Sequence, residues 1–443
     1  MPPPSVPWYP SLPVEAEIAC VPAQTPQGDG SPTIGFNINH FSTTSLLHMP
    51  VEIIENILVQ WTNLEWFAPA IARRICRRLK TITDFSPSCW SKLSLPYHSS
   101  ATDDGVRDWL SRAKAAPKEI SIDTDKFHLI MAALDGCKDA TSIIYRTPMF
   151  QDLSYCEQLQ IRLPEHMPRL RHLRVDFSNV YEFAGLCDIF EFYNAPYHGN
   201  FPCLTTLQLI FVDLIDFHVT PGLFPTVRNL SLESVNGPIL DLIEACSSTI
   251  EDLRVTINYS YSRASPLHGR IILPNLKVLI IENASRIAPC FDAPTLRLLH
   301  ANFDELDGNT TPFNSVVEWV TRRSLNPPPQ IVIANLLNGM SQLQHLMLCE
   351  SMETLRTCFE LLRDSRSTCP YLQSIEVVES ADTISVMILD TNFKESLRAC
   401  VAWRAEKVPG FTLQFVEDSI QVGRFEKYFT IEVCLFTGTC IIT

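Results

Sequence analysis

The side chains best suited to chemistry in this sequence are its 15 cysteines, its 11 histidines and a few acidic pairs. Cysteines and histidines bind transition metals when they recur at short spacing, and a cysteine activated by a histidine is a nucleophile. The sequence has no Cys-x-x-Cys, and its histidines are dispersed. The pairs Asp103-Asp104 and Glu376/Glu379 suit a first helical turn and a solvent-facing edge better than acid–base catalysis. We therefore predict neither catalytic nor metal-binding residues.

The glycine pattern also argues against nucleotide or cofactor chemistry. The sequence lacks G-x-G-x-x-G, G-x-x-x-x-G-K-[ST] and G-x-S-x-G. Only 15 of the 443 residues are glycine, which is about half the usual ~7%. We expect a protein that is not an enzyme and that uses no cofactor.

Composition narrows the class further. A net charge of −14 lacks the basic footprint of a nucleic-acid binder, and no apolar run approaches the ~20 residues of a membrane span. The cysteines are odd in number and many have apolar neighbours, which is typical of buried free thiols in a reducing compartment. The proline-interrupted start has no basic segment and does not resemble a signal peptide. We expect a soluble protein of the cytoplasm, the nucleus or both.

The chain divides by pattern into four segments. Residues 1–45 are proline-rich, with nine prolines in the first 32 positions, and we expect them to form a disordered leader. Helical patterns fill residues 46–90, a repeat fills residues 91–416, and residues 417–443 leave the repeat as an atypical tail or cap. The tail has strand character over Ile431–Phe436 and Cys440–Thr443.

The helical segment begins at Pro50, a residue that suits a helix start. The apolar residues of the stretch Pro50–Trp61 cover an arc of roughly 160°, wider than the ~100° stripe that packs on one neighbour. Such a helix either lies deep in a core or faces two surfaces at once. A second helix is expected over Ala70–Thr83, where five basic residues within Arg73–Lys80 form either a patch for an acidic partner or a solvated face.

The repeat has the frame L-x-x-L-x-L, and from Leu173 to Ile375 its central residues are 34, 23, 23, 26, 20, 47 and 29 positions apart. Most of these steps fall in or near the 20–29 range of leucine-rich repeats. We interpret the 47-residue step as an insertion.

Intervening helices are expected over Asp103–Ala115 behind a Thr102 cap, over Pro238–Cys246 and over Met352–Arg363. The apolar triplets are Trp90/Leu93/Leu95, Leu170/Leu173/Val175, Leu204/Leu207/Leu209, Val227/Leu230/Leu232, Ile250/Leu253/Val255, Leu276/Leu279/Ile281, Leu296/Leu299/Ala301, Leu343/Leu346/Leu348 and Leu372/Ile375/Val377, with weaker copies at Ile120/Ile122 and Leu159/Ile161.

Strands this short cannot bury an apolar face alone, so the units must stack on one another. The predicted fold class is therefore α/β: a solenoid with short parallel strands on its concave face and helices on its convex face, preceded by a small all-α domain.

The two features in this order resemble a known family. Met49-Pro-Val-Glu-Ile-Ile-Glu-Asn-Ile-Leu58, then Ile75-Cys-Arg-Arg-Leu-Lys80 and Pro87-Ser-Cys-Trp-Ser-Lys-Leu93, resemble the F-box. The whole chain is similar to fungal F-box proteins with degenerate leucine-rich repeats. It departs from the usual F-box pattern at Met49, where leucine is common, and at Leu79, where tryptophan is common.

The resemblance implies a substrate receptor of a cullin–RING (SCF-type) ubiquitin ligase. The F-box would bind a Skp-type adaptor, and through it a cullin, by means of Pro50, Ile53, Ile54, Ile57 and Leu58. The repeats would bind an unknown protein substrate on the outward side of their strands, and neither nucleic acid nor membrane is expected as a partner. Representative outward residues are Arg174, Gln208, Ser231, Arg254, Met347 and Glu376.

An alternative is a repeat scaffold outside any ligase, whose N-terminal helices only cap the repeats. That hypothesis predicts that the apolar arc of residues 51–61 is fully buried within the chain.

Overall fold

The chain in this computed structural model divides into two compact units. The first comprises Met1–Tyr155 and Arg162–His172, and the second Cys156–Ile161 and Leu173–Thr443. The structure describes residues 48–146 except 98 and 125, 167–178, 201–212, 219, 224–257 except 236, 270–306 except 285–286, 313–321, 327–364, 368–417 except 380, 428–429, 431–433 and 440–442. The predicted leader at 1–45 and the weak repeat copy at Leu159/Ile161 lie outside the described residues.

The first unit begins with α2 (Val51–Leu64), α3 (Ala68–Ile75), α4 (Arg77–Phe85) and the 3-10 turn η2 (Pro87–Trp90). Pro50 starts α2 as predicted: its carbonyl accepts hydrogen bonds from the backbone N–H groups of Ile53 and Ile54.

The single helix predicted over Ala70–Thr83 was wrong. Cys76 adopts an extended conformation (φ −158°, ψ 164°) and separates α3 from α4. Its Sγ accepts a hydrogen bond from the backbone N–H of Leu79 at 3.4 Å and so caps α4. The apolar spacing runs unbroken through this point, so periodicity alone could not reveal the break.

Three parallel strands complete the first unit: β1 (Lys92–Leu95), β2 (Lys118–Ile122) and β3 (Ala140–Arg146). Between them lie α5 (Asp103–Ala113) and α6 (Phe127–Asp135). The predicted Thr102 cap of α5 is confirmed, because its Oγ1 accepts from the N–H of Gly105 at 3.2 Å. Helices and strands share one core, in which the Trp109 ring centroid lies 4.7 Å from that of Trp90 and 5.3 Å from that of Trp66.

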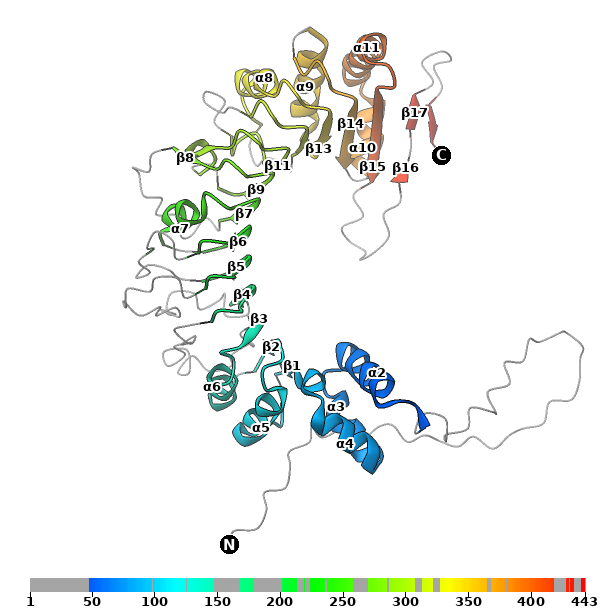
Figure 1. The fold of residues 1–443 in the computed structure, drawn as a ribbon. Helices are drawn as coiled ribbons and strands as arrows, with labels where there is room; N and C mark the ends of the chain where they lie inside the picture. The colour runs from blue at the N-terminus through cyan, green and yellow to red at the C-terminus, as the bar shows by residue number, and fades with distance from the viewer. Residues whose placement is uncertain are drawn as a thin grey trace, which may run out of the picture. The chain divides into compact units, whose positions relative to one another are not determined.

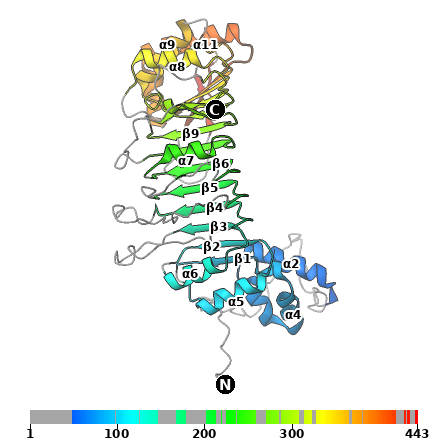
Figure 2. The same ribbon diagram turned by 60° about the vertical axis from the view of Figure 1, so that its left-hand side comes forward.

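The second unit is mixed α/β and is built on a large sheet whose consecutive pairs from β5 to β15 are parallel. Figures 1 and 2 show its strands stacked edge to edge, with α7, α8 and α9 on one side of the stack. The strands, in sheet order, are β4 (His172–Asp176), β5 (Thr206–Ile210), β6 (Asn229–Glu233), β7 (Asp252–Thr256), β9 (Val278–Glu282), β11 (Leu298–His300), β12 (Glu318–Val320), β13 (His345–Leu348), β14 (Ser374–Glu379), β15 (Thr412–Glu417) and β16 (Tyr428–Phe429). The helices are α7 (Ile239–Cys246), α8 (Gln330–Gly339), α9 (Met352–Asp364), α10 (Ala381–Leu389) and α11 (Thr391–Lys407), with the 3-10 turn η5 at Ala288–Cys290.

Each repeat buries the three apolar positions of its frame. Leu276, Leu279 and Ile281, for example, are 0%, 0% and 1% exposed, and the strand between them alternates inward and outward residues. A recurring threonine joins neighbouring units: Thr249 Oγ1 donates to the carbonyl of Val227 at 2.7 Å, and Thr295 Oγ1 to that of Leu276 at 3.0 Å. The predicted triplets in the described strands are therefore core positions of this unit.

The interpretation of the 47-residue step as an insertion was wrong. The step contains β12, which pairs in parallel with β11 and β13. Trp319 fills the position that leucine holds elsewhere: it is 0% exposed, and its indole N–H donates to the Ala301 carbonyl at 2.9 Å. The step therefore contains a further unit of the stack, which departs from the L-x-x-L-x-L frame at Trp319 and at Thr321.

Short strands lie beside and beyond the stack. β8 (Ile271–Ile272) pairs with β10 (Phe291–Asp292) apart from the main sheet. In the tail, β16 pairs with β15 in the antiparallel sense, and β17 (Ile431–Val433) forms an antiparallel pair with β18 (Cys440–Ile442). β16 therefore occupies the edge of β15.

Candidate docking surfaces

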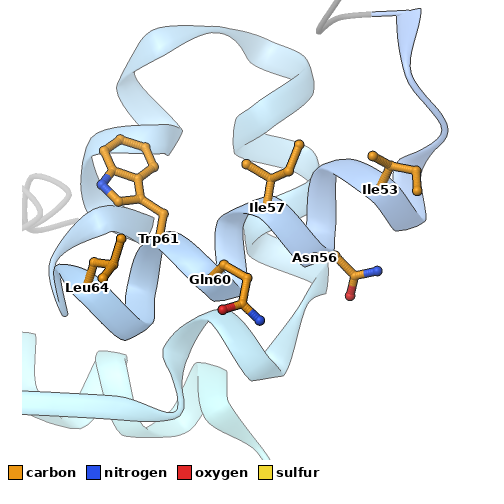
Figure 3. Close-up of a pocket in the computed structure, with 6 residues that line it drawn as sticks. All are labelled: Ile53, Asn56, Ile57, Gln60, Trp61 and Leu64. Atoms are coloured by element: carbon orange, nitrogen blue, oxygen red, sulfur yellow. The ribbon is translucent and has the colours of Figure 1, made fainter.

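The outer face of α2 is the most apolar exposed surface among the described helices of the first unit. Val51, Ile53, Ile57 and Leu64 are 47%, 46%, 43% and 85% exposed. Ile53, Asn56, Ile57, Gln60, Trp61 and Leu64 line a shallow depression of about 510 Å³ (Figure 3). In Figure 3 Ile53, Ile57 and Trp61, spaced four residues apart, project from one side of α2. The depression is thus an aliphatic and aromatic strip edged by two amides.

The opposite face of α2 forms the core of the helical bundle. Ile54 and Leu58 are 1% and 4% exposed, and Thr62 Oγ1 donates back to the Leu58 carbonyl at 2.9 Å. Two residues of the predicted adaptor-contact set, Ile54 and Leu58, thus pack inward in this structure. Pro50, Ile53 and Ile57 remain exposed from that set. Leu64 and Trp61 extend the surface and were missed, although both continue the spacing of Ile53 and Ile57.

Leu79, at the position where the resembled motif commonly has tryptophan, is 4% exposed within α4. A tryptophan from η2 supplies an aromatic ring to the same bundle: Trp90 is 2% exposed, and its indole N–H donates to the Thr83 carbonyl at 2.8 Å. The guanidinium groups of Arg73 and Arg112 lie 5.6 Å and 5.0 Å from its ring centre. The small core therefore has an aromatic centre despite Leu79.

The basic residues of α3 and α4 divide into two groups. Arg73 pairs with Asp84 at 2.7 Å, and Arg78 donates to the Met49 carbonyl at 2.7 Å, so both act inside the bundle. Arg74, Arg77 and Lys80 have exposed side chains. The two predicted alternatives, a patch for an acidic partner or a solvated helix face, thus apply to three basic residues instead of five.

The second candidate surface is the outward side of the strands in the second unit. The register places Gln208, Ser231 and Arg254 on neighbouring strands, and likewise Met347 and Glu376. Five of the six predicted substrate-surface residues therefore lie in one row, and Arg174 lies on β4, next to β5 in the sheet. The residues that complete the row were not named from the sequence, although each stands between the two inward positions of its repeat: Ile280, His300, Val320 and Gln414.

Several carboxylates of this surface lie at the ends of their strands: Asp176, Glu233, Asp252 and Glu282. Burial, followed by the charges of Asp176 and Glu282, raises the pKa of Glu233. The pKa of Asp176 is lowered: burial raises it, but hydrogen bonds from Arg174 and Ser178 together with the Arg174 charge outweigh that effect. Arg174 Nη2 lies 2.7 Å from Asp176 Oδ2, and Arg254 Nε lies 3.3 Å from Asp252 Oδ1. Arg174 and Arg254 are thus each paired with a carboxylate on the same strand.

No protein-family model and no curated protein matches this sequence. Among solved structures, the leucine-rich repeat-containing protein LegL7 from Legionella pneumophila is similar, with 14% sequence identity and a TM-score of 0.30. The similarity covers 74% of this chain and 91% of that one. Within the described part of the chain, no helix is both long and apolar enough to cross a membrane. The ten cysteines whose side chains are described are free thiols.

Proposed function

We propose that this protein is a substrate-receptor subunit of a cullin–RING (SCF-type) ubiquitin ligase. In this proposal α2 to η2 form an F-box that binds a Skp-type adaptor and through it a cullin, and the stacked strands form a leucine-rich-repeat solenoid that holds a protein substrate. Catalysis belongs to other subunits. The protein contributes by tethering, which raises the local concentration of its substrate near the ligase. The free thiols fit a reducing compartment, the cytoplasm or the nucleus.

The observation that carries the proposal is the double-sided character of α2. Its inner face already fills the bundle core with Ile54 and Leu58, yet its outer face keeps Val51, Ile53 and Ile57 between 43% and 47% exposed. Exposed aliphatic side chains that cluster on one helix face are typical of a protein-binding surface. The resemblance to the F-box motif indicates a Skp-type adaptor as the partner, and the exposed apolar strip on α2 is the surface that we propose it binds.

The capped-scaffold alternative requires this arc to be buried, and the exposed fractions of Ile53 and Ile57 argue against that requirement. One observation favours it nevertheless: Arg112 of α5 pairs with Asp84 of α4 at 2.9 Å, a contact that a cap on the first repeat units would make. Covering the repeats and binding an adaptor use different faces of the bundle. The two roles are therefore compatible, and the test must address α2 alone.

The test is co-expression of the full chain with a Skp-type adaptor from the same organism, followed by co-purification. Ile53→Asp and Ile57→Asp place a charge in the apolar strip and should abolish co-purification. Ile331→Asp is the matched control, because Ile331 is a 65% exposed isoleucine on α8. The substitution is the same chemical change at a position far from α2 in the sequence. Circular dichroism must show that all three variants remain folded.

Loss of the adaptor in the two α2 variants and its retention in the control would support the proposal. Failure of the unmodified chain to bind the adaptor would overturn it in favour of the capped scaffold. Equal loss in all three folded variants would also count against the proposal, since it would show that binding does not depend on the α2 strip.

A further inference from the structure

A cluster of charged and aromatic side chains joins the helical bundle to the strands of the first unit. Asp84 of α4 lies at its centre: Arg73 Nε of α3 is 2.7 Å from Asp84 Oδ1, and Arg112 Nη1 of α5 is 2.9 Å from the same oxygen. The side chains of Asp84, Arg73 and Arg112 are 26%, 13% and 24% exposed, so this ion-pair network is partly shielded from water. One carboxylate thus binds a cation of the bundle and a cation of the helix between β1 and β2.

The indole of Trp90 lies against the same two cations. The guanidinium carbons of Arg73 and Arg112 are 5.6 Å and 5.0 Å from its ring centre, and partial desolvation strengthens such cation–π contacts. Trp90 ends η2, just before β1, and its ring meets that of Trp109 of α5 at an interplanar angle of 76°. The Trp109 indole N–H donates to the Lys92 carbonyl of β1 at 2.9 Å. The cluster therefore contacts the bundle, α5 and the first strand at once.

Two contacts join α2 to this cluster. Trp66, in the turn that follows α2, lies 5.3 Å from Trp109 between ring centroids. Ser86, which caps the C-terminus of α4 two residues after Asp84, donates from its hydroxyl to Glu55 Oε1 of α2 at 2.5 Å. The position of α2 is thus linked to α5 and β1 through side chains that surround Asp84.

We propose that Asp84 is a positioning residue: it fixes the orientation of α2 relative to β1, β2 and β3, so that the bundle and these strands move as one body. Isolated surface ion pairs contribute little, but Asp84 binds two partly buried cations from two different parts of the unit. Among the described residues it is the only carboxylate within ion-pair distance of Arg73. Without it, two guanidinium charges would share one indole and repel each other.

The consequence for binding rests on the proposed function. An adaptor seated on the α2 strip would be held at a constant orientation to the strands with which the repeats begin. Relative motion is the default between substructures that share a small or polar interface, and Asp84 is placed to suppress it in this unit.

The test measures the distance between α2 and the strand side of the unit by pulsed electron–electron double resonance, in the full chain and without adaptor. A keto amino acid carries the spin labels, because the 15 native cysteines rule out labelling through thiols. The labels stand at Asn63 of α2 and at Lys138, just before β3, and both positions are exposed. We expect a single narrow distance distribution in the otherwise unmodified chain and one about twofold wider in Asp84→Ala.

Further variants separate the charge of Asp84 from its size and from general stability. Asp84→Asn keeps the size and removes the charge, so it should broaden the distribution as Asp84→Ala does. Asp108→Ala is the matched control and should leave the distribution narrow: Asp108 Oδ2 also pairs with Arg112, at 2.8 Å, but makes this ion pair within α5. Arg112→Gln breaks the link from the side of α5, and it takes the place of any Asp84 variant that circular dichroism shows to be unfolded.

A broad distribution in the unmodified chain, a narrow one in folded Asp84→Asn, or equal broadening in Asp108→Ala would each overturn the inference. A narrow distribution that depends on Asp84, without adaptor co-purification, would keep the positioning role and remove the ligase role. Adaptor co-purification together with a distribution that does not depend on Asp84 would keep the ligase role and remove the positioning role.

Discussion

The helix α2 and the central strands β9–β13 both turn apolar side chains outward, but they do so in different ways. On α2 the outward aliphatic residues are 43–85% exposed beside a core face of two aliphatic residues and a threonine. On the central strands the outward apolar residues are only partly exposed, and they lie above a core of leucine, isoleucine and tryptophan. The helix therefore has a large exposed apolar surface on a thin core, whereas the strands have a smaller exposed apolar surface on a deep core.

The difference indicates how each region tolerates change. The small bundle holds its shape with polar anchors, such as the Arg78 bond to the Met49 carbonyl and the Trp90 bond to the Thr83 carbonyl. The stack holds its shape by repetition, since each strand pairs with two neighbours and buries the same positions. A change on the inner face of α2 should thus unfold the bundle, and a change in one unit of the stack should be felt mainly by its neighbours.

The largest expected effect separates the two faces of α2. Ile54→Asp places a carboxylate at a position that is 1% exposed, which should cost about 4 kcal/mol or more because the buried charge has no partner. Ile53→Asp, one residue away and 46% exposed, should change stability by less than about 1 kcal/mol. Hydrogen exchange resolved by peptide reports the opening of α2 and α4 separately from the stack. Equal loss of protection in both variants would show that the two faces are not distinct.

The sequence predicted one of these regions better than the other. The arc of roughly 160° over Pro50–Trp61 indicated two apolar faces on the first helix. It could not say which isoleucine faces inward, because Ile53 and Ile54 are adjacent residues and both belong to the apolar arc. Which isoleucine faces inward depends on how α3 and α4 pack against α2. The start of α4 was not predicted, because the helix break at Cys76 is capped by a thiol, which gives no strong sequence signal.

In the stack, leucine spacing located the inward positions of most strands, since those positions are hydrophobic in every unit. The frame failed at β12, where Trp319 replaces the aliphatic residue, and it did not mark β3 or β15. Outward residues follow no such rule. Val320 could be assigned to the row only once the register of β12 was known. The position of the outward row was therefore predictable from the sequence, whereas its apolar residues were not.

A second test, of smaller effect, lies in the unit that the sequence pattern missed. Trp319→Ala removes a fully buried ring that lies 4.7 Å from the Phe303 ring centre and that donates to the Ala301 carbonyl. The cavity and the lost hydrogen bond should cost about 3–5 kcal/mol. Protection should fall most in β11, β12 and β13 and least in the first unit, as hydrogen exchange can show. Val320→Ala on the same strand is the control and should have little effect. A uniform loss across the chain would contradict the view that the stack responds locally.

The smallest expected effect concerns a carboxylate between β9 and β12. Glu305 is 3% exposed and accepts backbone hydrogen bonds from Asn302, at 2.8 Å, and from Asn283. Burial raises its pKa to about 7, against the opposing effect of these bonds. Because the folded state then holds a proton that the unfolded state has lost, stability should be complete below about pH 4.5 and should fall as the pH rises toward about 7. A shift of this size corresponds to at most about 3.4 kcal/mol.

Glu305→Gln should remove this pH dependence while leaving a constant offset, since one amide oxygen cannot replace two carboxylate oxygens as acceptors. Hydrogen exchange of residues 278–306, corrected for the intrinsic rate at each pH, measures the slope in the natural protein and in the variant. The residues of α2 serve as the internal reference, because the bundle lies in the other unit. A slope that is the same in α2 and in residues 278–306, or that survives in Glu305→Gln, would mean that another group titrates. A slope confined to residues 278–306 would show that even the deep core of the stack contains one position whose stability depends on charge.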